Sequence, residues 1–166
     1  MLPTHEAVKA ALHYNEETGV FTWKVRPNPR GHQKPGDVAG CTDKRCGYVL
    51  IRLARRLYLA HRLAWFYVTG EWPKDQIDHR DGNKGNNAFG NLRDVTNQVN
   101  GQNLRTAKRS SLTRLLGASK TENGRFRAYI TPPNRKTMAL GTFDTAEEAH
   151  NAYIQAKRQL HEGNTL

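Results

Sequence analysis

An asparagine- and glycine-rich segment over residues 76–103 limits the fold of this chain more than any other feature. A glycine or asparagine interrupts every apolar run within it, which is typical of turns and loops. Residues 77–79 and 91–95 nevertheless predict two short strands, and Thr96 begins a predicted helix. A surface loop is the simplest interpretation of such a segment. The order strand, loop, strand, helix weakens that interpretation, because it brings residues from the two ends of the segment together.

The residues before this segment predict a mainly β region followed by one apolar helix. The helix covers residues 61–69 and ends at Gly70 and Pro73. We expect His61 to cap this helix or to pack within it rather than to act as a second base. The other expected elements are a short amphipathic helix over residues 4–14, a strand over 19–24, a basic loop rich in proline and glycine over 26–36, and a hairpin of 48–53 with 56–60.

The C-terminal residues predict a small sheet covered by a helix. Residues 125–131 alternate with period two, so Phe126, Ala128 and Ile130 should be buried while the residues between them face outward. Residues 136–143 predict the returning strand. Thr145 and Glu148 then have the spacing of a capping box at the start of a helix.

Composition narrows the class of protein. The 166 residues are 37% hydrophobic, which permits packed cores but not a large one. No window approaches the ~20 apolar residues that a membrane span needs, so no membrane association is expected. Cys41 and Cys46 are too few for a disulfide scaffold or for a zinc site by themselves, and a zinc site would need added histidine ligands. We expect two buried or half-exposed thiols in a cytosolic (cytoplasmic) protein, with such a zinc site as the alternative.

The charge predicts a polyanionic partner, most often nucleic acid. The formal net charge is +11. Residues 101–136 contain nine lysines and arginines and one acid, whereas residues 61–100 contain five of each sign. A basic strand face that includes Tyr129 suits a phosphate backbone and base edges better than bulk water.

The segment around the acid–histidine pair Asp78-His79 resembles the HNH endonuclease motif, also called the ββα-metal or His-Me finger, in its homing-endonuclease-like form. The resemblance covers about 45 residues. It includes the pair itself, a DGNKxNN-like loop at 81–87, an asparagine of the "NL" strand at 91 and a terminal asparagine on the helix at 100. The HRLAW sequence at 61–65 and GEWP at 70–73 resemble the lead-in helix of the family.

The resemblance implies a role for each residue of the motif. His79 would act as the general base, and Asn91 would hold the loop so that the ring of His79 stays aimed. Asp78 and Asn100 would be metal ligands, and their hard oxygens suit Mg²⁺ or Mn²⁺ better than Zn²⁺. Many members have histidine where this chain has Asn100, although asparagine also occurs there. Arg93 is a candidate phosphate clamp, with a solvated strand arginine as the alternative.

Residues 112–162 resemble an ethylene-response-factor (APETALA-type) DNA-binding domain, most specifically in the LGTFDTAEEA sequence at 140–149. That family places a three-stranded antiparallel sheet in the major groove, with one helix packed behind it. Where the family often has arginine and tryptophan on the third strand, this chain has Thr137 and Ala139. The expected DNA-binding residues are Arg93, Arg105, Lys108, Arg109, Ser119, Arg125, Arg127, Tyr129, Thr131 and Thr137.

These observations predict an α+β protein with four parts. They are an N-terminal β-rich basic extension (1–60), a ββα-metal HNH catalytic region (61–104), a basic linker (105–111) and a domain of a small three-stranded sheet plus one helix (112–166). The two resemblances together imply metal-dependent cleavage of double-stranded DNA, in one strand or both, and the combination resembles homing endonucleases of phage or mobile-element type. We expect a monomer, with a dimer as the alternative, and no small-molecule substrate. The alternatives are a non-catalytic DNA-binding protein with a degenerate HNH module and a basic RNA-binding protein.

Overall fold

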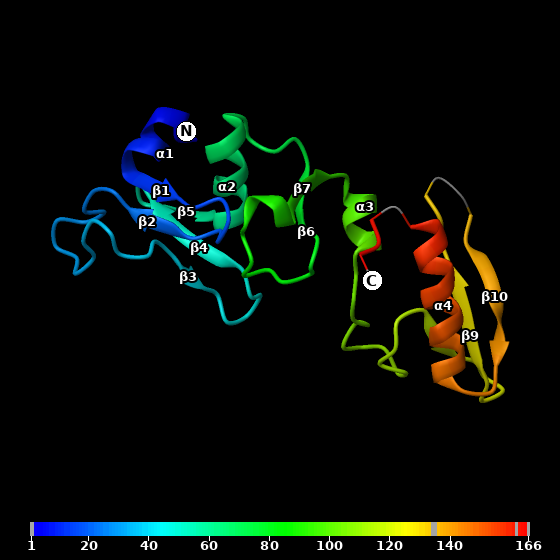
Figure 1. Ribbon diagram of the computed structural model, residues 1–166. Coiled ribbons are helices and arrows are strands. Elements are labelled where there is room, and N and C mark those ends of the chain that lie inside the picture. The colour runs from blue at the N-terminus through cyan, green and yellow to red at the C-terminus, as the bar shows by residue number, and fades with distance from the viewer. Residues whose placement is uncertain (1, 134–135, 162, 166) are drawn as a thin grey trace. The chain divides into compact units, whose positions relative to one another are not determined.

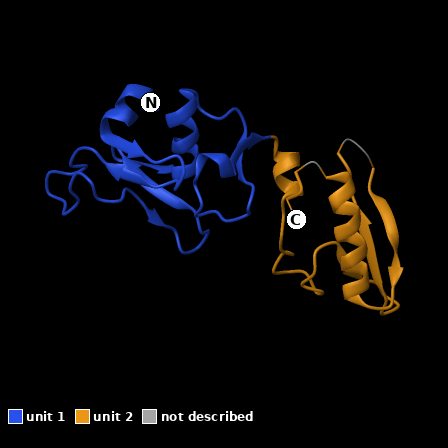
Figure 2. Cartoon of the chain, viewed as in Figure 1, with its two compact units in different colours: residues 1–95 blue, residues 96–166 orange. Residues whose placement is uncertain are grey.

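The computed structural model describes residues 2–133, 136–161 and 163–165. The chain divides into two compact units, residues 1–95 and residues 96–166 (Figure 2). Both units combine helices with small antiparallel sheets, so the expected α+β class is confirmed (Figure 1). Among the described residues, no helix has both the length and the apolar character needed to span a bilayer.

The first unit begins with helix α1 (His5–Ala11), which Thr4 caps by accepting a hydrogen bond from the Ala7 amide. The chain then extends into strand β1 (Leu12–Tyr14), which pairs antiparallel with β2 (Phe21–Trp23). The prediction of one helix up to residue 14 was therefore wrong at its end. The buried positions of this stretch suit either structure, and pairing with β2 decides in favour of the strand.

A three-stranded sheet in the order β3-β4-β5 follows. Its strands are β3 (Cys41–Thr42), β4 (Val49–Leu53) and β5 (Arg56–Leu59), so the predicted hairpin is confirmed and the short β3 is additional. Ala54 and Arg55 connect β4 to β5 with φ of 47° and 66°, the left-handed backbone that a two-residue hairpin turn requires. Cys41 and Cys46 are free and exposed rather than buried, because the edge strand and the turn after it lie at the surface.

Helix α2 (Ala60–Thr69) packs its buried face into the main core of this unit, as the apolar run over residues 61–69 predicted. It ends at Gly70, whose φ of 78° is the left-handed conformation common after helices. The side chains of Val8, Leu12, Ile51 and Leu63 are completely buried there. The core thus joins α1, both small sheets and α2 into one support for the strands that follow.

Strands β6 (Gln76–His79) and β7 (Leu92–Val95) form an antiparallel pair at the end of the first unit. The register places Asp78 opposite Arg93 and His79 opposite Leu92. A single 3₁₀ turn, η1 (Phe89–Asn91), leads into β7. The two predicted strands are confirmed, although Asn91 belongs to the turn rather than to the strand.

The second unit starts at helix α3 (Asn97–Gln102), capped by Thr96. Its sheet has the order β10-β9-β8, with β8 (Ala118–Lys120), β9 (Phe126–Ile130) and β10 (Met138–Phe143). Helix α4 (Ala146–Leu160) contacts all three strands and has the predicted capping box of Thr145 and Glu148. Ala128 and Ile130 are buried as expected, and Phe126 is partly buried.

Candidate functional site

His79 lies at the end of β6, and its side chain is buried. The strand ends there because the chain turns at once: the Gly82 amide donates to the His79 carbonyl oxygen over 2.8 Å. The Nε2 atom of His79 lies 3.2 Å from Oδ1 of Asn87, a buried residue in the loop between β6 and β7. This loop therefore folds back to hold the ring of the expected base.

The orientation of Asn87 determines which nitrogen of His79 carries the proton. Nδ2 of Asn87 donates to the Gly85 carbonyl oxygen over 3.2 Å, so Oδ1 is the atom presented to His79. An amide oxygen only accepts hydrogen bonds, and Nε2 must then be the protonated nitrogen of a neutral His79. The lone pair of the ring is consequently on Nδ1.

Burial lowers the pKa of His79 below its ordinary value of 6.5. The hydrogen bond to Asn87 and the nearby carboxylates of Asp81 and Asp78 oppose this effect, while Lys84 adds to it. Because burial prevails, His79 is neutral at physiological pH. A neutral imidazole is the form that can accept a proton.

Asp78 is also buried, and it forms an ion pair with Arg93 on β7. Nη2 and Nε of Arg93 lie 2.7 and 2.9 Å from the same oxygen, Oδ2 of Asp78. The antiparallel register places these residues opposite each other, which explains the contact. The structure therefore places Arg93, an expected DNA-binding residue, against the expected metal ligand.

The donor atoms around Asp78 are compatible with a magnesium-type ion. Asp78 supplies a hard carboxylate, and the described residues contain no group of three or more histidine, cysteine, aspartate or glutamate side chains that could hold a metal. Mg²⁺ characteristically binds through one or two carboxylates and keeps several waters.

Asn91 holds together the loop that carries Asn87. Its Oδ1 accepts a hydrogen bond from the Asp81 amide over 3.0 Å, and its Nδ2 donates to the Asn86 carbonyl oxygen and to Oδ1 of Asp81. Two of these bonds join the side chain to the backbone and the third joins it to the Asp81 side chain, so Asn91 ties the loop together. Burial alone would raise the pKa of Asp81, but hydrogen bonds from Asn86, Asn83 and Asn91 bring it below its ordinary value.

His61 is closer to the centre of the site than its sequence context indicates. It is buried on α2, and its ring meets that of His79 edge-on at 5.0 Å between centroids. Tyr48 lies 5.1 Å from His61 and 6.1 Å from His79, so the three rings form one cluster. Burial, with the neighbouring His79 and Arg62, lowers the pKa of His61 to about 3. The expectation that His61 packs within the structure is met, but it packs against the expected base.

Asn100 lies on α3 and thus belongs to the second unit. That helix is tied to the C-terminal residues of its own unit. The Gly163 amide donates to Oε1 of Gln102 over 3.0 Å, and Oγ1 of Thr165 donates to Oδ1 of Asn103 over 2.5 Å. Buried Lys157 of α4 donates to the carbonyl oxygen of Leu104, just after the helix.

The outer face of the second sheet carries the expected DNA-binding residues of β8 and β9. Arg127 stands in the middle strand, with Ser119 of β8 and Thr142 of β10 as its register partners. Tyr129, next on the same face of β9, is 44% exposed, and its hydroxyl lies 3.5 Å from Oγ of Ser119. Nε of Arg125 forms an exposed ion pair with Asp144 at 2.9 Å.

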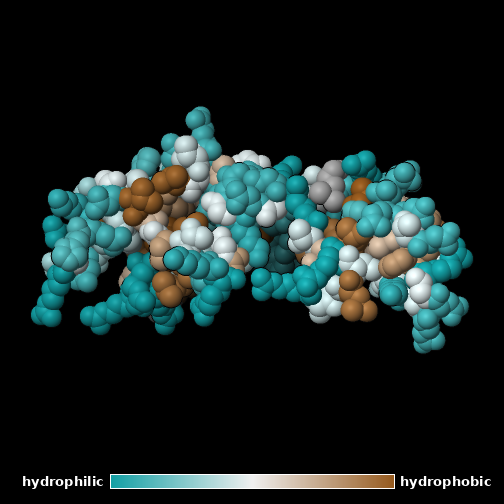
Figure 3. Space-filling view, turned by 90° about the horizontal axis from the view of Figure 1, so that it is seen from below, coloured by the Kyte–Doolittle hydropathy of each residue, from teal (hydrophilic) through white to brown (hydrophobic). Residues whose placement is uncertain are grey.

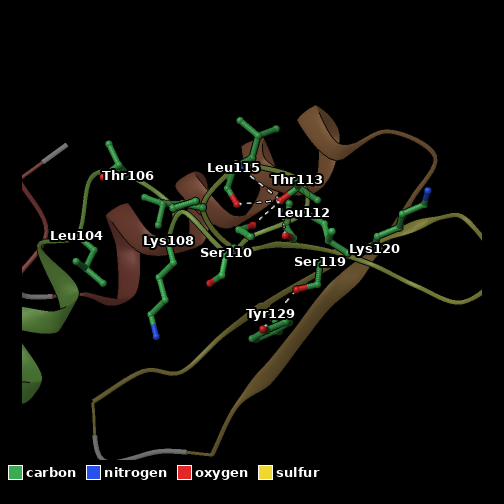
Figure 4. Close-up of a pocket in the computed structure, with 15 residues that line it drawn as sticks. Leu104, Thr106, Lys108, Ser110, Leu112, Thr113, Leu115, Ser119, Lys120 and Tyr129 are labelled. Carbon is green, nitrogen blue, oxygen red and sulfur yellow. Dashed lines mark hydrogen bonds between the residues drawn. The ribbon is translucent and has the colours of Figure 1, made fainter.

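A hollow of about 690 Å³ opens beside this face (Figure 4). The loop between α3 and β8 forms most of its lining, and strand β8 and Tyr129 complete it. In Figure 4 the side chains of Ser119 and Tyr129 point toward each other at its edge. Leu112 of the loop is 89% exposed.

Hydrophilic side chains cover most of the surface seen in Figure 3, with small apolar patches among them.

The remaining expected DNA-binding residues fall into two groups. Lys108 and Arg109 are exposed in the loop after α3. The others have partners in the second unit: Nη2 of Arg105 donates to the carbonyl oxygen and Oγ1 of Thr165, while the hydroxyls of Thr131 and Thr137 lie 2.8 Å apart.

The sequence analysis assigned no role to Asn87, the residue that contacts His79. The local signal that could have indicated it is its place in the DGNKxNN-like loop.

Comparison with known proteins agrees with this geometry. Residues 58–102 match the family described as HNH endonuclease. The matched range begins in β5, includes α2, β6 and β7 and ends with α3, so it contains every residue assigned to the motif. No curated protein and no solved structure matched the chain. The match supports an HNH nuclease domain, with DNA as its substrate, over residues 58–102.

Proposed function

We propose that the protein is a divalent-metal-dependent endonuclease of the homing-endonuclease type, which hydrolyses phosphodiester bonds of double-stranded DNA. The observation that carries the proposal is the setting of His79. It is a buried, neutral imidazole whose Nε2 is engaged by Asn87, and it follows a buried carboxylate on the same strand. The family match over residues 58–102 supports the same reaction class.

In the proposed reaction, His79 accepts a proton from a water molecule through Nδ1. The water oxygen attacks the phosphorus atom, and the bond from phosphorus to the leaving oxygen breaks. A positioned general base of this kind contributes roughly 10²–10⁴-fold to the rate. Asn91 serves the reaction indirectly, because it closes the loop in which Asn87 lies.

Asp78 and Asn100 would hold the metal ion. When bound, a divalent cation stabilises the negative charge that develops on the phosphate and the leaving oxygen. Arg93 compensates part of the charge of Asp78 in the structure and keeps its carboxylate in one orientation through two hydrogen bonds to Oδ2. Orientation of a ligating carboxylate by hydrogen bonds is a common feature of metal sites.

The second unit would grip the DNA. Its loop after α3 and its outer sheet face present Lys108, Arg109, Arg127 and Tyr129 to solvent. A sheet of three strands with a helix behind it has the architecture expected from the resemblance to ethylene-response-factor domains. The cations of such a face can contact phosphates. Its tyrosine can contact the edges or the flat faces of bases.

A second candidate function is that of a non-catalytic DNA-binding protein. The ion pair between Asp78 and Arg93 is the observation that favours it, because a carboxylate shared with an arginine can serve the fold alone. The two candidates differ in one measurable property. Only the nuclease converts supercoiled plasmid into nicked or linear forms in the presence of Mg²⁺ or Mn²⁺.

The experiment is plasmid cleavage by the full chain with Mg²⁺, with Mn²⁺ and with EDTA, next to the His79→Ala variant. We expect cleavage with either metal, none with EDTA, and a loss of at least about 100-fold in the variant with nearly unchanged DNA affinity. The exposed histidine His13 provides the matched control, His13→Ala, which should cleave like the wild type. Equal cleavage by His79→Ala and wild type would remove His79 from the mechanism, and DNA binding without any cleavage would favour the second candidate.

A further inference from the structure

The N-terminal hairpin touches the main chain of the residue that holds His79. Tyr14, a buried residue of β1, donates a hydrogen bond from its hydroxyl to the Asn87 carbonyl oxygen over 2.6 Å. The two residues are 73 positions apart in the sequence. Burial and the nearby carboxylate of Glu16 raise the pKa of Tyr14 far above its ordinary value, so the phenol remains a donor.

The turn between β1 and β2 meets the same peptide at very short range. Gly19 has a φ of +71°, and a Cβ atom placed on it would lie 2.2 Å from both the carbonyl carbon of Asn87 and the amide nitrogen of Ala88. The Phe89 amide donates to the carbonyl oxygen of Glu16 in this turn over 2.8 Å. The turn therefore packs directly against residues 87–89, with no room for a side chain between them.

We propose that the hairpin of β1 and β2 is a positioning element of the nuclease centre, with Tyr14 and Gly19 acting through Asn87 on His79. The inference rests on the proposed function. Tyr14 and Gly19 fix the main chain of Asn87, and the side chain of Asn87 fixes the ring and the tautomer of His79. The N-terminal region thereby has a role in the chemistry in addition to its contribution to the core.

The hydrogen bond between His79 and Asn87 is long, so a small displacement of Asn87 would affect His79. The separation of 3.2 Å between Nε2 of His79 and Oδ1 of Asn87 is at the long end of the range for N–H···O hydrogen bonds. A shift of the Asn87 main chain by a few tenths of an ångström away from His79 would break the bond. The ring would then lose its hydrogen bond to Asn87, which favours the Nε2–H tautomer.

The first test compares two tyrosine-to-phenylalanine variants of the full chain. Tyr14→Phe removes only the hydroxyl that reaches Asn87. Tyr67→Phe is the matched control, because the ring of Tyr67 packs in the same cluster at 5.6 Å from Tyr14, and within the described part of the chain no hydrogen bond joins its hydroxyl to Asn87. We expect kcat for plasmid cleavage to fall by about 10–100-fold in Tyr14→Phe, with unchanged KM and DNA affinity, and to stay at the wild-type value in Tyr67→Phe.

The second test asks whether Tyr14 acts through Asn87. Asn87→Ala removes the side chain that contacts His79, so adding Tyr14→Phe to it should lower kcat no further. Long-range ¹H–¹⁵N spectra of the metal-free proteins provide a readout apart from activity. The wild type and Tyr67→Phe should show His79 as the Nε2–H tautomer, whereas Tyr14→Phe and Asn87→Ala should show exchange between tautomers.

Three results would separate the possible failures. A wild-type chain that shows the Nε2–H tautomer but cuts no DNA would overturn the proposed function. Cleavage and His79 spectra of Tyr14→Phe that equal those of Tyr67→Phe would overturn this inference alone. Fully additive losses in kcat from Tyr14→Phe and Asn87→Ala would also overturn it, because the hydroxyl would then act by another route. Gly19→Ala, which forces a clash with Asn87, should reproduce the tautomer exchange if it folds.

Discussion

Replacing His61 with phenylalanine should make the first unit more resistant to acid. The imidazole is 4% exposed, and its Nδ1 has no hydrogen-bond partner among the described residues. Burial is the main cause that disfavours its protonated form, the neighbouring titratable groups His79 and Arg62 add to it, and Tyr48 packs against it as a neutral ring. Phenylalanine has a similar shape, so it can keep the ring contacts while removing the titration.

The expected size of the effect follows from the pKa of His61, which burial lowers from 6.5 to about 3. Between these values the unfolded chain binds a proton at this position and the folded chain does not. The free energy of unfolding is therefore unaffected above pH 6.5 and decreases as the pH falls toward 3, by about 1.4 kcal/mol per pH unit. Between pH 7 and pH 5 the wild type should lose roughly 2 kcal/mol through His61 alone.

Urea unfolding followed by tryptophan fluorescence measures this difference. The three tryptophans, Trp23, Trp65 and Trp72, all lie in the first unit, so the signal reports that unit only. We expect the free energy of unfolding of His61→Phe, minus that of the wild type, to increase by roughly 2 kcal/mol from pH 7 to pH 5. Other titrating groups contribute to both proteins and largely cancel in the difference.

The control is His13→Phe, because His13 is exposed on β1. Its free energy of unfolding should follow that of the wild type over the same pH range. Parallel pH dependences of His61→Phe and the wild type would contradict this prediction. They would mean that His61 is as easily protonated in the folded protein as in the unfolded chain.

Three further predictions concern DNA, metal and the second unit. Arg127→Ala should reduce the slope of log K for DNA binding against log[salt] by about 0.9. Arg125→Ala should reduce it by less, because Asp144 already pairs with Arg125. Equal slopes for the two variants would contradict this prediction. Asp78→Ala should raise the Mg²⁺ or Mn²⁺ concentration at half-maximal cleavage by about 10–100-fold, and an unchanged midpoint would show that Asp78 does not bind the ion. A chain that ends at Gly101 should unfold like the full chain by tryptophan fluorescence but cleave far less at equal metal concentration; full cleavage by it would show that the second unit is dispensable.

The local sequence predicted those elements whose signals lie within a few residues. The alternation over residues 125–131 and the capping box at Thr145 each involve one short stretch, and both were confirmed. The strand β1 was missed because its apolar positions fit a continued helix equally well. Only the pairing of β1 with β2, seven or more residues further along, distinguishes the two.

The sequence predicted which residues form the candidate site but not the contacts that hold them in place. The resemblance to HNH endonucleases identified Asp78, His79 and Asn91, which the structure brings together through β6, β7 and the loop between them. The contacts of Tyr14 with Asn87 and of His61 with His79 could not be predicted in this way. They join residues from separate elements, and no local periodicity records which elements pack against each other.

The position of Asn100 has a physical consequence that the motif alone does not reveal. Helix α3 has only six residues, far fewer than a helix needs to be stable in isolation. Its stability must come from tertiary contacts, and Lys157, Gly163 and Thr165 of the second unit supply them through hydrogen bonds to residues 102–104. The residue expected to complete the metal site is thus held by the unit expected to grip the DNA. We therefore expect the folding of the second unit to determine whether helix α3, and Asn100 on it, is ordered.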